Sequence, residues 1–464
     1  MLKPLVIFSL LLLSVSSFGQ DRLSYLKNIE LLLEEEHYED LLAQKSELEK
    51  HTLETDTLSA SIYSVFGECH LILNDLSEAE FYYVKSLDLL KLLNQNVTGH
   101  YSNVLYNLTD VYLASGKFDN AFSSAKELVS LDKELYGSKS PLYLETLFIY
   151  TDILIETGQY IQALKALKQV DGKFKDDFLN ALILTKKGDI LTALGNYEKS
   201  VDFLESSLDT YSQLNDTLSF TLAQASLGLN YIGQGKYPQA ENVLLQSRKA
   251  FEGLPETEFY VDNVNSNIAL AQMALGRSNQ AIAIYEELLH KDSAYFGVVH
   301  PKYLTSLINV GMAYNDIDDH NKAESYMLKA LTIVTDIYGE KSKNEASIYT
   351  NLGIIKREKG DFDAALNAFD SAEELFINST GKETIEFSTV KFNKGVTLLL
   401  MDSDLAEKEL ISSLKLRKSL VGIGHPKYAE STNYLGLYYW KKSDLKNARK
   451  YFEETFINFF DQIQ

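Results

Sequence analysis

Four asparagines recur at a constant interval in the second half of the chain. Asn267, Asn309, Asn351 and Asn393 are each 42 residues apart, and Asn107 has the same local context upstream. A carboxamide has two donors and an acceptor, so it can pair with a peptide backbone whatever the peptide side chains are. Such a row predicts contacts to an extended peptide. The alternative is that these side chains bond within the fold or follow a repeat consensus.

An apolar row accompanies the asparagines. Residues three positions apart lie on the same face of a helix, and each of the last four asparagines is followed at that distance by an apolar residue. We therefore predict a groove with a polar row beside an apolar one. Its candidate residues are Asn107, Asn267, Asn309, Asn351, Asn393, Leu270, Met312, Ile354 and Val396.

Residues that perform catalysis or bind metals form no known motif in this sequence. None of the eight histidines belongs to a His-Glu-x-x-His zinc motif, and neither a Gly-x-Ser-x-Gly elbow nor a Walker loop is present. Cys69, the single cysteine, is next to His70 on an expected helix, so the two side chains point apart and make a poor dyad. We expect a buried, inert Cys69, and helix-boundary roles for His300 and His425, each of which precedes a proline. The sequence predicts no enzyme activity, no catalytic residue, no cofactor and no metal site.

A repeat of about 42 residues positions the asparagines. From Asn351 the chain continues with Leu352 and Gly353, and then with the spaced residues Ala365 and Phe369. A small residue at the position of Ala365 allows two helices to approach closely. This small residue recurs at Ala79, Ala121, Ala163, Ser200, Ala240, Ala281, Ala323, Ala365, Ala406 and Ala448.

From about residue 60 to 464 this frame resembles the tetratricopeptide (TPR) repeat. The Gly424-His425-Pro426 junction also resembles kinesin light chain arrays and the arrays that precede bacterial caspase-like CHAT domains. The resemblance implies an all-α fold, a right-handed superhelical solenoid of ten to eleven antiparallel helix pairs. First helices would line its concave side. A plain TPR unit has 34 residues, and we expect the additional residues between one repeat's second helix and the next repeat's first helix.

The N-terminus resembles a secretory signal peptide. Lys3 precedes an apolar run, and Ser17 and Gly19 are small residues at the positions that a signal peptidase reads. The predicted organisation is a signal peptide at 1–19, an atypical helical unit or cap at 20–60 and a TPR array at 61–464. A periplasmic or secreted protein is expected. No later segment has 18 consecutive apolar residues, so no membrane span is expected in the mature chain.

Charge narrows the range of partners. The chain has 65 acidic and 44 basic residues, a net charge of −21, and cleavage that removes Lys3 would make it one unit more negative. A field of this sign repels phosphate backbones, so nucleic acid is a poor partner. A basic protein or peptide is compatible with it, although solvated helix faces account for most of the charge.

The last expected helix is more apolar than a terminal repeat requires. Phe456, Ile457, Phe459 and Phe460 widen its inner stripe, and a contiguous apolar patch of this kind indicates an interface. The helix could pack on another subunit, mediate self-association, or continue into an effector domain in longer relatives. Three functions follow as hypotheses: an interaction scaffold that holds a peptide or protein in the concave groove, the sensor half of a truncated or split CHAT system, and a self-assembling envelope protein.

Overall fold

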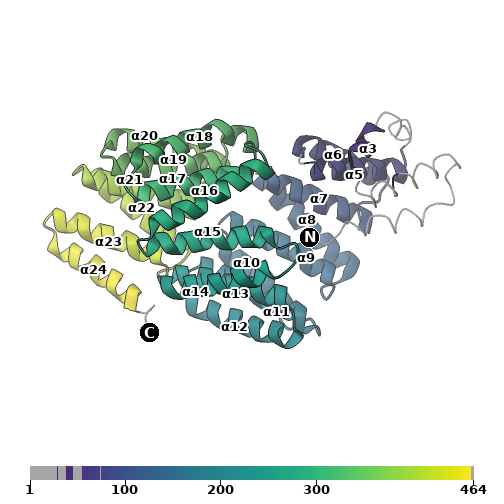
Figure 1. Cartoon of the computed structure of the whole chain (residues 1–464), viewed down its shortest axis with the longest axis horizontal. Coiled ribbons are helices and arrows are strands. Elements are labelled where there is room, and N and C mark those ends of the chain that lie inside the picture. The colour runs from purple at the N-terminus through teal and green to yellow at the C-terminus, as the bar shows by residue number, and fades with distance from the viewer. Residues whose placement is uncertain (1–28, 30–37, 45–54, 74, 116, 461–464) are drawn as a thin grey trace. The chain divides into compact units, whose positions relative to one another are not determined.

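A computed structural model describes residues 29, 38–44, 55–73, 75–115 and 117–460 of the chain. Within these residues every regular element is a helix, which confirms the all-α prediction. The chain divides into two compact units, Met1–Ile153 and Leu154–Gln464, called unit 1 and unit 2 below (Figure 1). The predicted signal peptide lies outside the described residues.

Unit 1 contains two helix pairs, α5/α6 and α7/α8, preceded by a short helix and followed by α9, which crosses into unit 2. The bounds are α3 Tyr38–Ala43, α5 Thr57–Ile72, α6 Leu76–Leu92, α7 Gly99–Ala114, α8 Phe118–Tyr136 and α9 Pro141–Glu156. Leu41 of α3 packs with Leu58 and Phe66 of α5. The first helix of the α5/α6 pair begins at Thr57.

Unit 2 contains α10, a 3-10 turn and seven further helix pairs. Their bounds are α10 Tyr160–Leu167, η3 Lys168–Val170, α11 Asp177–Ala193, α12 Tyr197–Leu214, α13 Thr217–Gly233, α14 Tyr237–Glu252, α15 Glu258–Ala274, α16 Ser278–Tyr295, α17 Pro301–Asp316, α18 His320–Tyr338, α19 Lys343–Glu358, α20 Phe362–Ser379, α21 Ile385–Leu400, α22 Leu405–Leu420, α23 Pro426–Lys441 and α24 Leu445–Phe460. Together with the pairs of unit 1 and with α9 and α10, these helices account for the ten predicted repeats.

The small residues predicted to seat each second helix are all buried. Nine of the ten have no exposed surface, and Ala448 is 3% exposed. The first helix contributes a matching glycine. A Cβ added at Gly353 would lie only 2.5 Å from the ring of Phe369, sixteen positions later, and Gly311 meets Met327 at the same interval. Small residues on both helices thus allow the close approach that the spacing predicted.

The residues beyond a plain TPR unit mainly lengthen the helices. In the repeat that starts at Pro301, α17 has 16 residues and α18 has 19, and only residues 339–342 connect α18 to α19. The expectation that these residues form the junction is therefore wrong for this repeat, since α18 continues through Tyr338. Gly339 ends it with a φ of 77°, in the region that favours glycine.

The two histidines that precede proline cap helices, as predicted. The Nδ1 atom of His300 accepts the backbone N–H of Lys302 at 3.1 Å, and Nδ1 of His425 accepts that of Lys427 at 3.0 Å. The first N–H groups of a helix have no partner inside it, so the rings of His300 and His425 satisfy one of them at α17 and α23.

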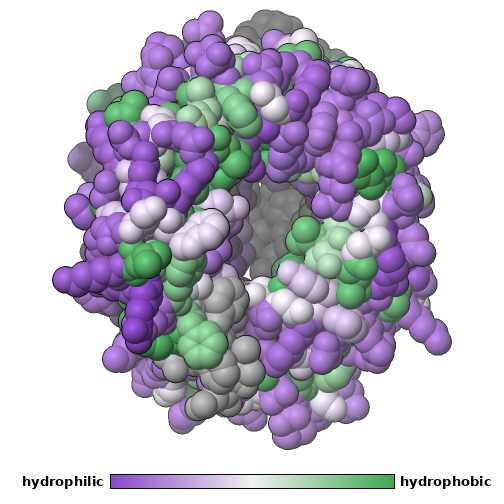
Figure 2. All heavy atoms as spheres, turned by 90° about the vertical axis from the view of Figure 1, so that its left-hand side faces the viewer, coloured by the Kyte–Doolittle hydropathy of each residue, from purple (hydrophilic) through white to green (hydrophobic). Residues whose placement is uncertain are grey.

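Unit 2 also contacts itself across a long interval of sequence. His425 is 9% exposed, and its ring lies against the turn between α11 and α12, where a Cβ added at Gly195 would be 2.9 Å from the ring. The same ring bonds to the backbone of Ala193. These contacts join the start of α23 to a turn more than 200 residues earlier, so the array of unit 2 closes on itself. Viewed from the side of α20–α24, the surface is hollowed at its centre (Figure 2).

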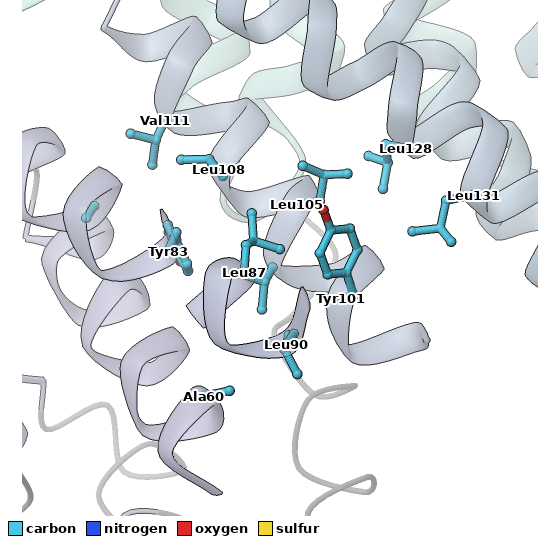
Figure 3. Close-up of a cluster of buried hydrophobic side chains, with 12 residues drawn as sticks. Ala60, Tyr83, Leu87, Leu90, Tyr101, Leu105, Leu108, Val111, Leu128 and Leu131 are labelled. Carbon is cyan, nitrogen blue, oxygen red and sulfur yellow. The ribbon is translucent and has the colours of Figure 1, made fainter. Parts of the chain in front are cut away.

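The core of unit 1 continues from repeat to repeat. Tyr83 and Leu87 of α6 meet Leu105 and Leu108 of α7 and Leu128 of α8 in one buried cluster (Figure 3). Each helix pair therefore buries apolar surface on its neighbour, as a stacked array requires. None of the described helices combines the length and the apolar character that a membrane span requires.

Candidate peptide-binding site

The first helices of neighbouring repeats contact each other directly in unit 2. Contacts join α13 to α15, α17 to α19, and α19 to α21. Because the first helices lie side by side, equivalent positions on them form rows that run along the array. A stacked array of helix pairs presents such rows on its concave surface.

Three asparagines of the predicted row lie on three first helices of unit 2. Asn267 on α15, Asn309 on α17 and Asn351 on α19 are partly exposed, and none of them makes a side-chain hydrogen bond with another described residue. Asn263, one turn before Asn267, accepts a 2.8 Å hydrogen bond from Nζ of Lys302 on the next first helix. Polar groups beside the row thus bind the first helices together, while the three carboxamides keep their donors and acceptors.

Asn393 differs from these three residues. It is 6% exposed, its Oδ1 accepts a 2.8 Å hydrogen bond from Arg357, and its Nδ2 donates to the Thr389 carbonyl at 2.9 Å. The carboxamide of Asn393 therefore bonds within the protein, which is the alternative given for the asparagine row in the sequence analysis. Asn107 of unit 1 also lies against a neighbour, the Tyr83 hydroxyl.

The apolar row changes character along unit 2. Leu270 is 44% exposed, Met312 and Ile354 are partly buried, and Val396 is only 5% exposed within the core. Val396 is thus a packing residue, and the row is available mainly at the other three positions. It extends in the opposite direction to Leu229 of α13, which is 39% exposed. The sequence analysis did not include Leu229, although it directly follows Gly228 as Ile354 follows Gly353.

The environment of Cys69 keeps its thiol protonated. Cys69 is fully buried, and burial, reinforced by the negative charge of Glu68, raises the pKa of the thiol to about 12. His70 stacks on the Tyr82 ring and its Nδ1 lies 3.3 Å from Asp75, so it is directed away from the thiol. The predicted burial of Cys69 is confirmed. In the described ranges, no group of three His, Cys, Asp or Glu residues is placed to hold a metal ion.

The last helix has apolar side chains at its surface. Phe456 and Ile457 of α24 are 60% and 57% exposed, while Phe452 faces inward and contacts Gly436. The side chains of Phe459 and Phe460, which belong to the same predicted interface, lie outside the described residues. Exposed aromatic and aliphatic groups at the end of an array are typical of a surface that another element covers.

Fold and groove together define a class of protein, a helical-repeat scaffold. Family models described as tetratricopeptide repeat match residues 181–216, 260–336 and 306–378. The chain therefore contains tetratricopeptide repeats over these segments, and the segments include Asn267, Asn309 and Asn351 of the row.

Curated relatives match at low identity. Protein KINESIN LIGHT CHAIN-RELATED 3 of Arabidopsis thaliana is 21% identical over 343 residues, which cover 72% of this chain and 52% of the relative. A clustered mitochondria protein homolog of Coccidioides immitis is 24% identical over 117 residues, 25% of this chain and 9% of that protein. The chain thus spans about half of the first relative and a small part of the second.

Solved structures of similar fold cover most of the chain, at low sequence identity and with TM-scores below 0.5. A Rap conjugation gene regulator of plasmid pLS20, in complex with the Phr* peptide, has a TM-score of 0.49 at 14% identity and covers 78% of this chain and 96% of its own. A tetratricopeptide repeat protein from Parabacteroides merdae has a TM-score of 0.40 at 18% identity, with 65% and 100% covered.

Proposed function

We propose that this protein is an exported scaffold that holds an extended peptide segment in the concave groove of unit 2. The observation that supports this role most directly is the row of Asn267, Asn309 and Asn351. Three identical side chains occupy the same position on three first helices, and none has a partner among the described residues. The partly exposed Leu270, Met312 and Ile354 beside them provide apolar contacts. Such a groove performs binding rather than catalysis.

The spacing of the row suits an extended backbone. Packed helices lie about 8–10 Å apart, and an extended chain advances about 3.3 Å per residue. Successive asparagines can therefore reach the peptide at about every third residue. Because a carboxamide pairs with backbone groups, the asparagines provide affinity for many sequences, and the apolar row selects the side chains between them.

The test uses a peptide selected on the protein itself. A library of random dodecapeptides is displayed and selected against the protein, and the best binder is measured by fluorescence anisotropy against wild type and a triple variant, Asn267→Ala, Asn309→Ala and Asn351→Ala. A hydrogen bond contributes about 0.5–1.5 kcal/mol, so three lost bonds should weaken binding by roughly tenfold or more.

A matched control separates the row from asparagine content in general. Asn279, Asn367 and Asn378 are exposed residues on the second helices α16 and α20, and their joint replacement by alanine should leave affinity unchanged. Equal affinity of both triple variants for the selected peptide, with helicity intact by circular dichroism, would remove the row from the proposal.

Export is the second part of the proposal and is supported by the sequence alone. The apolar run after Lys3 and the small residues Ser17 and Gly19 favour cleavage after Gly19. N-terminal sequencing of the protein recovered from its native host should begin at Gln20. Recovery of an uncleaved N-terminus from the cytosolic fraction would contradict export.

Self-association through α24 is a second candidate role, favoured by the exposure of Phe456 and Ile457. Replacing both residues with serine should lower the mass measured by light scattering if the helix joins two copies. A wild-type protein that is monomeric at micromolar concentration would rule out this role and leave α24 as a surface for a different protein.

A further inference from the structure

Aromatic rings stack between the two helices of several repeats. A ring near the end of the first helix meets a ring on the second helix, three residues after the small residue that seats it. These stacks are the pairs His70/Tyr82, Tyr314/Tyr326 and Tyr439/Tyr451. Their ring centroids lie 5.6–5.8 Å apart and their planes are within 9° of each other. Tyr326 also packs against the cluster that contains Ile282 and Tyr285 of α16, so the second ring fills the space toward the preceding second helix.

The repeat formed by α7 and α8 lacks the second ring of this stack. Tyr112 on α7 has the position of Tyr314, but Ser124 on α8 has the position of Tyr326. The Ser124 hydroxyl is turned toward its own helix and toward α7, where its Oγ donates to the Ala121 carbonyl at 3.1 Å and lies 2.9 Å from Oγ1 of Thr109. Within the described ranges, no ring stacks on Tyr112. One face of a half-buried aromatic ring is therefore left without the contact that the other stacks have.

A cavity of about 310 Å³ lies where the ring is missing. It runs between α6 and α8, and Tyr112 and Ser124 both line it. Leu87, Leu105 and Leu108 form an apolar wall of the cavity, and each is at most 5% exposed (Figure 3). Pockets that hold small molecules begin at about 300 Å³, so this cavity is large enough for a molecule of one or two rings.

The cavity is acidic beyond Ser124. Glu127 follows Ser124 on α8 by three residues, about 4.5 Å along the helix axis, and its Oε1 accepts a 2.8 Å hydrogen bond from the Tyr101 hydroxyl. Asp88 of α6 lines the same end, and Lys91 is the single cation among the lining residues. Two carboxylates and one ammonium group leave a net negative charge, which favours a cationic ligand over an anionic one.

We propose that this cavity in unit 1 binds a small aromatic amine of one or two rings. The ring stacks on Tyr112, in the place that Tyr326 fills beside Tyr314, and stacked rings at such distances attract each other. The ammonium group, on a short side chain of the ring, donates to the carboxylates of Glu127 and Asp88. The site lies in unit 1 and does not depend on the asparagine row of unit 2.

The first test fills the cavity from the protein side. Tryptamine is titrated into the full-length protein and its affinity is measured by ligand-observed NMR. Ser124→Tyr introduces the ring that other repeats have at this position and should weaken tryptamine binding at least tenfold. Ser130→Tyr adds the same ring at an exposed position further along α8 and should change the affinity less than twofold. Equal affinity of Ser124→Tyr and wild type, or an equal loss in Ser130→Tyr, would overturn the proposal.

The second test leaves the cavity unfilled, so it decides the question even if Ser124→Tyr folds poorly. Glu127→Gln keeps an acceptor for Tyr101 and removes the charge, so tryptamine should bind about threefold to fivefold more weakly. Glu134→Gln, at an exposed position of the same helix, should bind tryptamine as wild type does. Indole-3-propionate, which carries a carboxylate in place of the amine, should bind wild type at least tenfold more weakly than tryptamine. An absence of tryptamine binding to wild type, equal affinity for the two indoles, or equal affinities of the two glutamine variants would each contradict the proposed site.

Discussion

Replacing Glu68 with glutamine should change the pH dependence of local stability in unit 1. Burial raises the pKa of the Glu68 carboxyl from 4.5 to about 7. Between these two values the folded state binds more protons at this residue than the unfolded state, so stability falls as pH rises. Glutamine does not titrate, and the variant should lose this part of the pH dependence.

The magnitude follows from the two pKa values. One pKa unit corresponds to about 1.36 kcal/mol, so a rise from 4.5 to about 7 costs the folded state roughly 3 kcal/mol once Glu68 is fully ionised. Some of this cost is already present at pH 5. Between pH 5 and pH 8 the free energy of opening should therefore fall by roughly 2.5 kcal/mol more in wild type than in Glu68→Gln. The neighbouring Tyr83 and Cys69 have raised pKa values and remain neutral over this range.

Hydrogen exchange of the α5 amides measures this free energy locally when each rate is referred to the intrinsic rate at the same pH. Glu134→Gln on α8 is the control, because Glu134 is exposed, and its curve should follow that of wild type. Parallel curves for wild type and Glu68→Gln between pH 5 and pH 8 would refute the reasoning, since Glu68 would then ionise as an ordinary surface carboxyl.

Two further predictions concern the contact that closes unit 2. Gly195→Asn should separate α23 from the α11–α12 turn, because the added Cβ would meet His425, and the radius of gyration measured by X-ray scattering should increase. Gly235→Asn is the control, since Gly235 has a similar positive φ with open space around it, and its radius of gyration should equal that of wild type. Equal radii for the two variants would contradict the contact. Burial and the positive charges of Lys427 and Arg417 lower the pKa of His425 from 6.5 to about 4, so the stability of the closure should fall by up to roughly 3 kcal/mol as pH drops through that interval. His425→Asn keeps a capping oxygen without the titration, and hydrogen exchange at α23 should then show less acid sensitivity than wild type; identical acid sensitivity would contradict the assignment.

The sequence predicted the local packing of the array well. Small residues such as Ala365 are buried at each expected second helix, because the close approach of two helices depends on a residue type that recurs at a fixed interval. The caps formed by His300 and His425 were predictable for a similar reason. A proline at the first turn marks the start of a helix, and the residue before it occupies the capping position.

Contacts between repeats were not predictable from the same periodicity. Asn393 matches the frame of Asn351, yet Arg357 from the neighbouring repeat occupies its carboxamide, and no spacing within one repeat reveals that contact. The closure between His425 and Gly195 depends on curvature summed over many helix pairs.

The most direct measurement of the central proposal is a backbone N-methylation scan of the peptide selected on the protein. Methylation removes one N–H donor at a time and leaves the side chain in place. If Asn267, Asn309 and Asn351 hold the backbone, affinity should fall about fivefold at positions three residues apart, and this pattern should vanish in the triple alanine variant. A uniform loss along the peptide, or the same pattern in the variant, would contradict recognition by the asparagine row.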